Sequence, residues 1–160
     1  EDADGLNEAA PALARAWEAV LPKGIPPRME SQMKVDIDAL NSAAGGEDWE
    51  SAQSAALRIA QNELDLRLLY QLVIDVDLAR LKLWTRQLPV DVAAEDAGLV
   101  LANVAALDRV WERTRHAVES AAPVDAALQE LGKAADAEDL PAVGEAAAAL
   151  NQAVGGMRVR

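Results

Sequence analysis

The chain of 160 residues contains no cysteine and no phenylalanine, and it has a single tyrosine and a single histidine. The absence of cysteine excludes disulfides, thiolate metal ligands, iron–sulfur clusters and a cysteine nucleophile. One histidine leaves no second imidazole for a histidine metal site or for the Glu-x-x-His pairs of di-iron bundles. No glycine-rich loop is followed by the lysine that a phosphate site uses. We therefore expect no metal, no other cofactor and no enzymatic activity.

Basic residues are also scarce. Lysine and arginine number 15 against 27 aspartates and glutamates, which gives a net charge of −12. A surface of this sign disfavours nucleic acids and anionic lipids as partners. The longest apolar-rich stretch, residues 64–84, carries six charged side chains, which exclude a transmembrane helix. We expect a protein or a small molecule as partner, no nucleic acid and no membrane-spanning segment.

Apolar residues, 51% of the chain, recur with helical periodicity, and no segment alternates as a strand does. Glycine, proline and capping residues predict helices over residues 6–21, 27–43, 48–87, 91–121, 124–135 and 140–154. The two longest are joined by a short turn after Pro89 and form a long central hairpin. We predict an all-α, up-and-down bundle with a four-helix core, in which shorter helices pack on this hairpin. Residues 6–160 then form a single domain, and residues 1–5 form a flexible acidic tail.

A weak internal repeat aligns residues 40–61 with residues 131–152. Both segments contain the end of a helix, an acidic turn and an alanine-rich helix, with Asp48 or Asp139 as the N-cap. Two explanations stay open, a duplication and a shared bias toward alanine.

A charged row interrupts the apolar face of the predicted helix 48–87. Tyr70 and Asp77 lie one heptad apart in the middle of that face, and Arg80 lies on the same side. With a turn at residues 88–91, Asp77 comes level with Asn103 on the next helix, and Arg80 lies near Asp96. This register predicts a buried polar cluster of these side chains. The cluster is either an ion pair that sets the helix register or a polar ligand site inside the bundle.

Other residues with functional chemistry have structural interpretations. His116 lies opposite the apolar face of its predicted helix, so we expect it to be exposed. Met29 and Met33 are spaced as copper-binding methionines sometimes are, but they continue the apolar stripe of Ile37, and we place them in the core. We expect Asp36 to be a solvated acid.

The acidic start EDADG, the alanine bias and the A-x-x-A-rich helices that follow an acidic cap extend over most of the chain. In these features it resembles the mature part of alanine-rich extracytoplasmic helical-bundle proteins and lipoproteins of high-GC bacteria, whose function is unassigned. The resemblance implies an exported or lipid-anchored protein. It carries over no functional residue.

Because the sequence lacks a catalytic constellation, it favours a non-enzymatic binding or interaction protein of the cell envelope. The alternative is a small-ligand carrier or sensor that uses the polar cluster, with Asp77, Arg80, Asn103, Asp96 and Tyr70 as ligand-binding residues. The predicted hairpin also leaves an apolar end near Leu78, Leu81, Trp84 and Leu99. If the first helix does not cover this end, we expect a homodimer through it.

Overall fold

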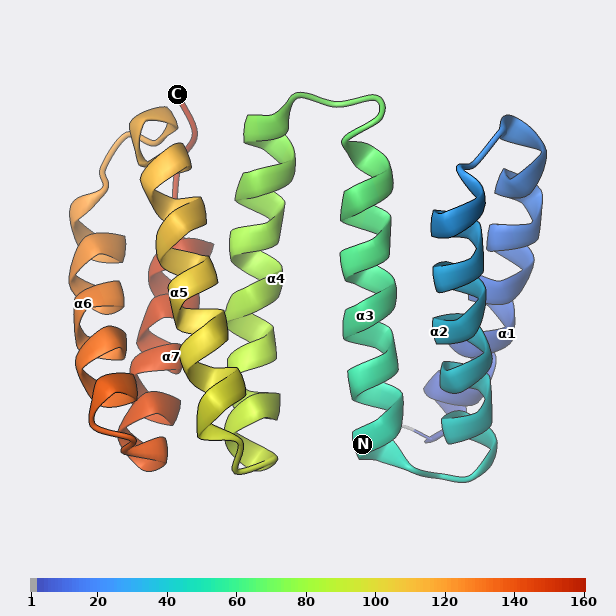
Figure 1. The fold of residues 1–160 in the computed structure, drawn as a ribbon, viewed down its shortest axis with the longest axis horizontal. Coiled ribbons are helices and arrows are strands. Elements are labelled where there is room, and N and C mark those ends of the chain that lie inside the picture. The colour runs from blue at the N-terminus through green and yellow to red at the C-terminus, as the bar shows by residue number, and fades with distance from the viewer. Residues whose placement is uncertain (1–2) are drawn as a thin grey trace. The chain divides into compact units, whose positions relative to one another are not determined.

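A computed structural model of the chain describes the backbone of residues 3–160 and the side chains from residue 5 onward. In this part of the chain the regular structure is helical and no strand is formed, which confirms the all-α prediction (Figure 1). A lone antiparallel bridge joins Val118 to Val159. The α-helices are α1 (Ala3–Val20), α2 (Pro27–Gly45), α3 (Trp49–Arg67), α4 (Val73–Ala93), α5 (Ala97–Thr114), α6 (Ala122–Asp136) and α7 (Leu140–Gly155), with short 3-10 helices η1 (Leu21–Lys23) and η2 (Arg115–Ala117).

The chain divides into two compact units, residues 1–69 and 70–160, where the sequence predicts one domain over residues 6–160. Each unit has a separate cluster of buried apolar side chains. The predicted tail also differs, because α1 begins at Ala3 and includes the last three residues assigned to the tail. Glu1 and Asp2 lie outside the described residues.

Unit 1 is built from α1, α2 and α3, with α2 in contact with both of the others. Its buried face combines Met33, Ile37 and Leu40 of α2 with small side chains of α3 such as Ala52 and Ala55. Because alanine has only a Cβ, the backbones of α2 and α3 can approach closely and still exclude water.

Unit 2 is a four-helix bundle, and in this unit the predicted four-helix core is formed. Helix α4 contacts α5 and α7, and α6 contacts the same two helices, so the four helices close into a ring. Trp111, Leu81, Leu88 and Leu131 are fully buried in the core. Among the described residues, every helix is too short or too polar to cross a lipid bilayer.

The long central hairpin is not formed as predicted. Residues 48–87 make two helices, α3 and α4, separated by a connection at residues 68–72. Pro89 does not end a helix but lies inside α4, which continues to Ala93. A proline removes one backbone hydrogen bond, while burial of Leu88 and Asp91 on the same helix favours its continuation. The turn to α5 therefore comes at residues 94–96, six residues later than the sequence argument placed it.

Three helix-to-helix turns share one backbone design. Glu47, Glu95 and Glu138 have φ values of 56°, 53° and 54°, in the left-handed region. In each turn, the backbone amides of the glutamate and of the aspartate after it donate hydrogen bonds to carbonyl oxygens of the preceding helix, as in a Schellman cap. At the first turn, Asp48 N bonds Ala43 O at 2.9 Å and Glu47 N bonds Ala44 O at 3.2 Å. The aspartate that follows each glutamate then caps the next helix. The two copies of the predicted repeat therefore share a turn, and α4–α5 supplies a third example.

Candidate functional site

Asp77 lies near the start of α4 and is 1% exposed. Its Oδ2 accepts a hydrogen bond from Nε of Arg113 at 2.9 Å, and its Oδ1 accepts from Nη1 of Arg80 at 3.5 Å. The hydrogen bond from Arg113 raises the pKa of that guanidinium. The predicted ion pair of Asp77 and Arg80 is therefore present. It is joined by an arginine of α5 that the sequence argument did not select.

The remaining members of the predicted ligand cluster lie elsewhere. Asn103 donates a hydrogen bond to Oδ2 of Asp91, and Asp96 caps α5 by accepting from the backbone amide of Leu99. Tyr70 is 73% exposed in the connection between α3 and α4. The cluster of Asp77 with Asn103 and Asp96 is thus not formed. The physical reason is the later turn, which brings Arg113 level with Asp77 and leaves Asn103 about 15 Å further along the helix axis.

Asp36 is the buried carboxylate of unit 1, although the sequence analysis placed it in solvent. It is 2% exposed and accepts hydrogen bonds from Arg58 Nε at 2.7 Å, Asn62 Nδ2 at 2.7 Å and Gln32 Nε2 at 3.1 Å. Burial alone would raise the pKa of Asp36, but the three hydrogen bonds outweigh it and the pKa is lowered. The sequence signal was present, because Asp36 lies between Met33 and Ile37 on the apolar stripe of α2.

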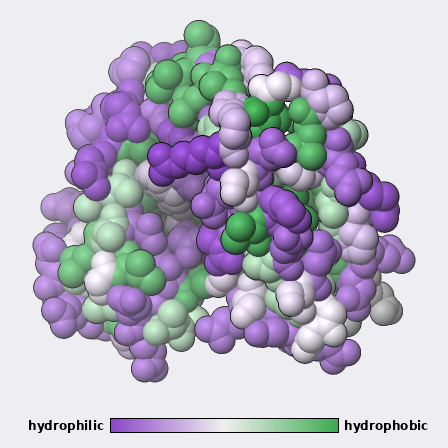
Figure 2. Space-filling model, turned by 45° about the vertical axis from the view of Figure 1, so that its right-hand side comes forward, coloured by the Kyte–Doolittle hydropathy of each residue, from purple (hydrophilic) through white to green (hydrophobic). Residues whose placement is uncertain are grey.

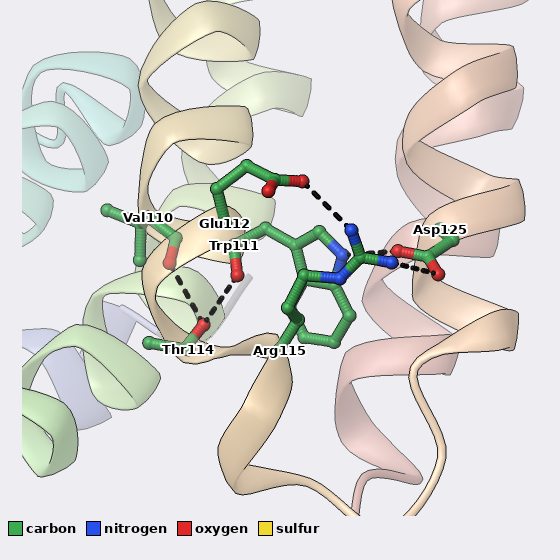
Figure 3. Close-up of polar contacts among 6 residues, drawn as sticks. All are labelled: Val110, Trp111, Glu112, Thr114, Arg115 and Asp125. Atoms are coloured by element: carbon green, nitrogen blue, oxygen red, sulfur yellow. Dashed lines mark hydrogen bonds and ion pairs between the residues drawn. The ribbon is translucent and has the colours of Figure 1, made fainter.

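A third polar contact joins α5 and η2 to α6. The buried indole of Trp111 donates to Oδ1 of Asp125 at 2.6 Å, and Arg115 Nη2 donates to Oδ2 of the same carboxylate at 2.9 Å (Figure 3). Arg115 Nη1 also bonds Glu112 at 3.2 Å. Both oxygens of Asp125 are thereby engaged.

These contacts have a common geometry. Each of Asp36, Asp77, Asp91 and Asp125 accepts hydrogen bonds from a side chain of another helix, and the hydroxyl of Thr85 on α4 lies 3.1 Å from Oδ1 of Asn151 on α7. A buried carboxylate that is satisfied in only one helix register favours that register over its neighbours. Such interhelical bonds are what the register-setting interpretation of the Asp77–Arg80 pair predicts.

Three cavities lie away from the predicted ligand residues. One of about 650 Å³ lies along α2 and α3, one of about 260 Å³ lies beside Trp17 between α1 and α2, and one of about 140 Å³ lies beside Met157. None of the three is lined by Asp77, Arg80 or Asn103.

The predictions for His116 and Met33 are confirmed, whereas Met29 is not part of the buried core. His116 is exposed, and Met33 is buried in the core of unit 1 with Met29 partly buried nearby on the same helix. Over the described part of the chain, no group of three His, Cys, Asp or Glu side chains is placed to hold a metal ion.

Among the described residues, the exposed large apolar side chains are concentrated in the segment that follows α3 in the sequence. Residues 68–73, which we call the apolar connection, include Leu68, Leu69, Tyr70, Leu72 and Val73, with exposures of 38%, 49%, 73%, 71% and 60%. In the space-filling view, hydrophobic side chains form patches on a surface that is otherwise largely hydrophilic (Figure 2). This surface is not expected from the sequence, in which the periodicity predicts these residues as the middle of one buried helix.

The apolar connection also differs locally from the three turns at Glu47, Glu95 and Glu138, in which an aspartate caps the next helix. Leu72, the N-cap of α4, makes no side-chain capping bond, and residues 68–72 contain no glycine or proline. Connections between compact units are ordinarily polar or rich in glycine and proline.

Comparisons of the chain with protein-family models, with curated proteins and with solved structures give no match.

Proposed function

We propose that the protein is a non-enzymatic binding protein whose recognition surface is the apolar connection, residues 68–73. The observation that carries the proposal is the contrast between this surface and the interior. The buried carboxylates of Asp36, Asp77 and Asp91 accept hydrogen bonds from side chains of neighbouring helices, whereas five large apolar side chains of one short segment face solvent. The largest exposed apolar patch on a soluble domain is often functional.

The exposures of the five side chains add up to nearly three whole side chains. This corresponds to roughly 500 Å², the upper part of the range for the largest patch on a monomer. Complete burial of one large apolar side chain contributes about 1.5–3 kcal/mol. Covering the connection would therefore supply several kcal/mol before the cost of association, enough for a weak or moderate complex.

The alternative of a small-ligand carrier receives less support from the contacts. Both oxygens of Asp77 are occupied by arginines, and Asn103 is bonded to Asp91. A ligand at this position would have to displace ion pairs that join α4 to α5. The proposed setting at the cell envelope rests on the compositional resemblance.

A matched pair of valines tests the recognition surface. Val73 in the connection and Val35 on α2 are 60% and 59% exposed. Val35 is flanked one turn away by Ser31, Gln32, Asp38 and Ala39. The probe is Nile red, an uncharged dye that fluoresces on apolar surface, added to the full chain at low protein concentration. We expect Val73→Ser to reduce the dye fluorescence and Val35→Ser to leave it unchanged.

A stronger variant, Tyr70→Ser with Leu72→Ser, should abolish most of the signal, with circular dichroism showing that the helices are retained. Equal dye binding by wild type, Val73→Ser and the double variant would refute the proposed surface, because a real apolar site must lose affinity when its side chains become hydroxyls.

A further inference from the structure

We propose that the cavity between α1 and α2, beside Trp17, binds a small organic cation, namely a protonated or quaternary amine. Both helices belong to unit 1, and the cavity is separate from the apolar connection. The inference therefore goes beyond the proposed function. It rests on the side chains that line the cavity and on their charges.

The cavity forms where α1 packs loosely on α2. Among the described side chains of α1, Ala10 alone is fully buried, whereas Leu13 and Trp17 are half-buried. The space left beside Trp17 has a volume of about 260 Å³. Pockets for drug-sized ligands span about 300–1,000 Å³, so this cavity suits a smaller molecule.

The inner lining of the cavity is aromatic and apolar. Trp17 and Ile37 both line the cavity and both pack in the core of unit 1, and Leu21 lines it one helical turn after Trp17. An indole attracts a cation through the quadrupole of its ring, more strongly than the other aromatic side chains do. Such a lining holds the apolar part of a ligand and favours a positive charge attached to that part.

The outer lining supplies negative charge. Glu18 of α1 and Glu30 of α2 are exposed at the cavity, and within the described residues neither side chain has a hydrogen bond or an ion pair. Lys34 also lines the cavity, but its ammonium group bonds Asp38 at 3.0 Å. The carboxylates of Glu18 and Glu30 therefore attract a cation from solution and repel an anion.

An organic cation fits these groups better than a metal ion does. A metal ion such as calcium needs several oxygen ligands in one place, and Glu18, Glu30 and Asp38 do not form a group that could hold a metal ion. An organic ammonium ion spreads its charge over several methyl or methylene groups. These groups can contact an indole while carboxylates lie further away on both sides.

The probe for this site is choline, which carries a trimethylammonium group. Its control is the neutral alcohol in which a tert-butyl group replaces the trimethylammonium group, so that shape is kept and charge is lost. The chain has four tryptophans, and the indole N–H signal of Trp17 in nuclear magnetic resonance spectra of the full chain is assigned by its loss in Trp17→Leu. We expect choline to shift this signal with half-saturation in the millimolar range. The alcohol should bind at least about tenfold more weakly, and sodium chloride at equal concentration should not shift the signal.

Charge removal tests the two carboxylates. Glu18→Gln and Glu30→Gln should each weaken choline binding by about threefold, because each removes one charge at an exposed position. The matched control is Glu8→Gln, which removes the same charge from an exposed position on α1, about 15 Å away from Glu18 along the helix axis. This control should leave choline binding unchanged.

Removal of the indole tests the aromatic contact. Trp17→Leu should weaken choline binding by about fivefold or more, measured by saturation transfer from the protein to the N-methyl protons of choline. Circular dichroism checks that the helices are retained. If this variant does not fold, the two glutamate variants still test the site, because their side chains are exposed.

The inference is wrong if choline leaves the Trp17 signal unmoved, or if the neutral alcohol or sodium chloride moves it equally. It is also wrong if a folded Trp17→Leu binds choline as wild type does. Equal weakening by Glu8→Gln and Glu18→Gln would assign the effect to the charge of the whole chain and overturn the site. Nile red binding at the apolar connection is measured separately, so failure of either proposal is distinguishable from failure of the other.

Discussion

The left-handed glutamates make a prediction of unusual sign, namely that replacing Glu138 by glycine stabilises unit 2. A residue with a Cβ at φ 54° costs roughly 1–2 kcal/mol, and glycine relieves that cost. Glycine also makes the unfolded chain more flexible, which lowers the free energy of unfolding by about 0.5–1 kcal/mol. The structure gives the Glu138 side chain no hydrogen bond or ion pair within the described residues that would be lost. We therefore expect Glu138→Gly to increase the free energy of unfolding by about 0.5–1 kcal/mol.

The neighbouring residue supplies the control. Ala137 immediately precedes Glu138 but has φ −84°, an ordinary right-handed value. Ala137→Gly brings the same flexibility without relief of strain, so it should lower stability by about 0.5–1 kcal/mol. Two adjacent substitutions to glycine are thus expected to have opposite signs. Glu95 and Ala94 repeat the comparison at the α4–α5 turn, with φ values of 53° and −76°.

The assay is urea unfolding of the full chain followed by circular dichroism. The double variant with Glu95→Gly and Glu138→Gly should increase the free energy of unfolding by about 1–2 kcal/mol, because the effects of distant turns are additive. For a unit of this size that gain raises the melting temperature by roughly 4–8 °C per kcal/mol. If Glu138→Gly destabilises the protein as much as Ala137→Gly does, the strain argument fails.

Two further predictions concern the buried carboxylates. Asp77→Ala should lower the free energy of unfolding by roughly 3–5 kcal/mol in urea titrations, because it removes the carboxylate from a largely buried Arg80. Arg113→Ala should cost less, roughly 1–3 kcal/mol, because the buried Asp77 loses one donor but keeps Arg80; a larger effect of Arg113→Ala than of Asp77→Ala would contradict this reasoning. The lowered pKa of Asp36 means that the unfolded chain binds this proton more readily, so its contribution to stability is present above about pH 4 and is lost as pH falls below that value. Unfolding measured at several pH values should show a weaker acid dependence in Asp36→Asn, and an unchanged acid dependence would exclude this role for Asp36.

Helix ends with local signals were predicted closely from the sequence. The predicted helix 140–154 is Leu140–Gly155 in the structure, and the predicted helix 27–43 is Pro27–Gly45. Asp139 accepts a hydrogen bond from the backbone of Ala142 at 3.1 Å, as an N-cap does, and Gly46 lies at the C-cap of α2. Such signals depend on a few neighbouring residues, so periodicity and capping rules are sufficient to find them.

The break between α3 and α4 carries no such signal. Leucine, tyrosine and glutamine at residues 68–72 are compatible with a helix, and nothing in their order predicts that they leave it. The break coincides with the boundary between two compact units, each with its own core, so it depends on contacts that are distant in the sequence. Local propensity is commonly overruled by such contacts.

At the candidate site, the sequence predicts the contact within one helix, between Asp77 and Arg80, but not the contact between helices, from Asp77 to Arg113. Asp77 and Arg80 lie three residues apart on α4, so their pairing follows from helix geometry alone. The partner on α5 depends on where the intervening turn lies. Placing that turn at Pro89 instead of at Glu95 moved the expected partner from Arg113 to Asn103.

The turn could nevertheless have been located from the sequence. Each of the three shared turns reads as a small residue followed by Glu-Asp, at residues 46–48, 94–96 and 137–139. Two antiparallel helices joined by such a turn pair residues that lie at equal distances on either side of its glutamate. Asp36 lies eleven residues before Glu47 and Arg58 lies eleven after it, and these two form an ion pair.

The same rule applied to Glu95 takes Asp77, eighteen residues before it, to Arg113, eighteen after it, which is the ion pair observed. Glu95 lies among alanines, which favour a helix, and the nearby Pro89 is a more familiar helix breaker. A proline removes one hydrogen bond from a helix that can otherwise continue, whereas the Glu-Asp turn satisfies the end of one helix and the start of the next. The stronger of the two signals was therefore the one that closes both helix ends, and it sets the register on which the buried ion pairs depend.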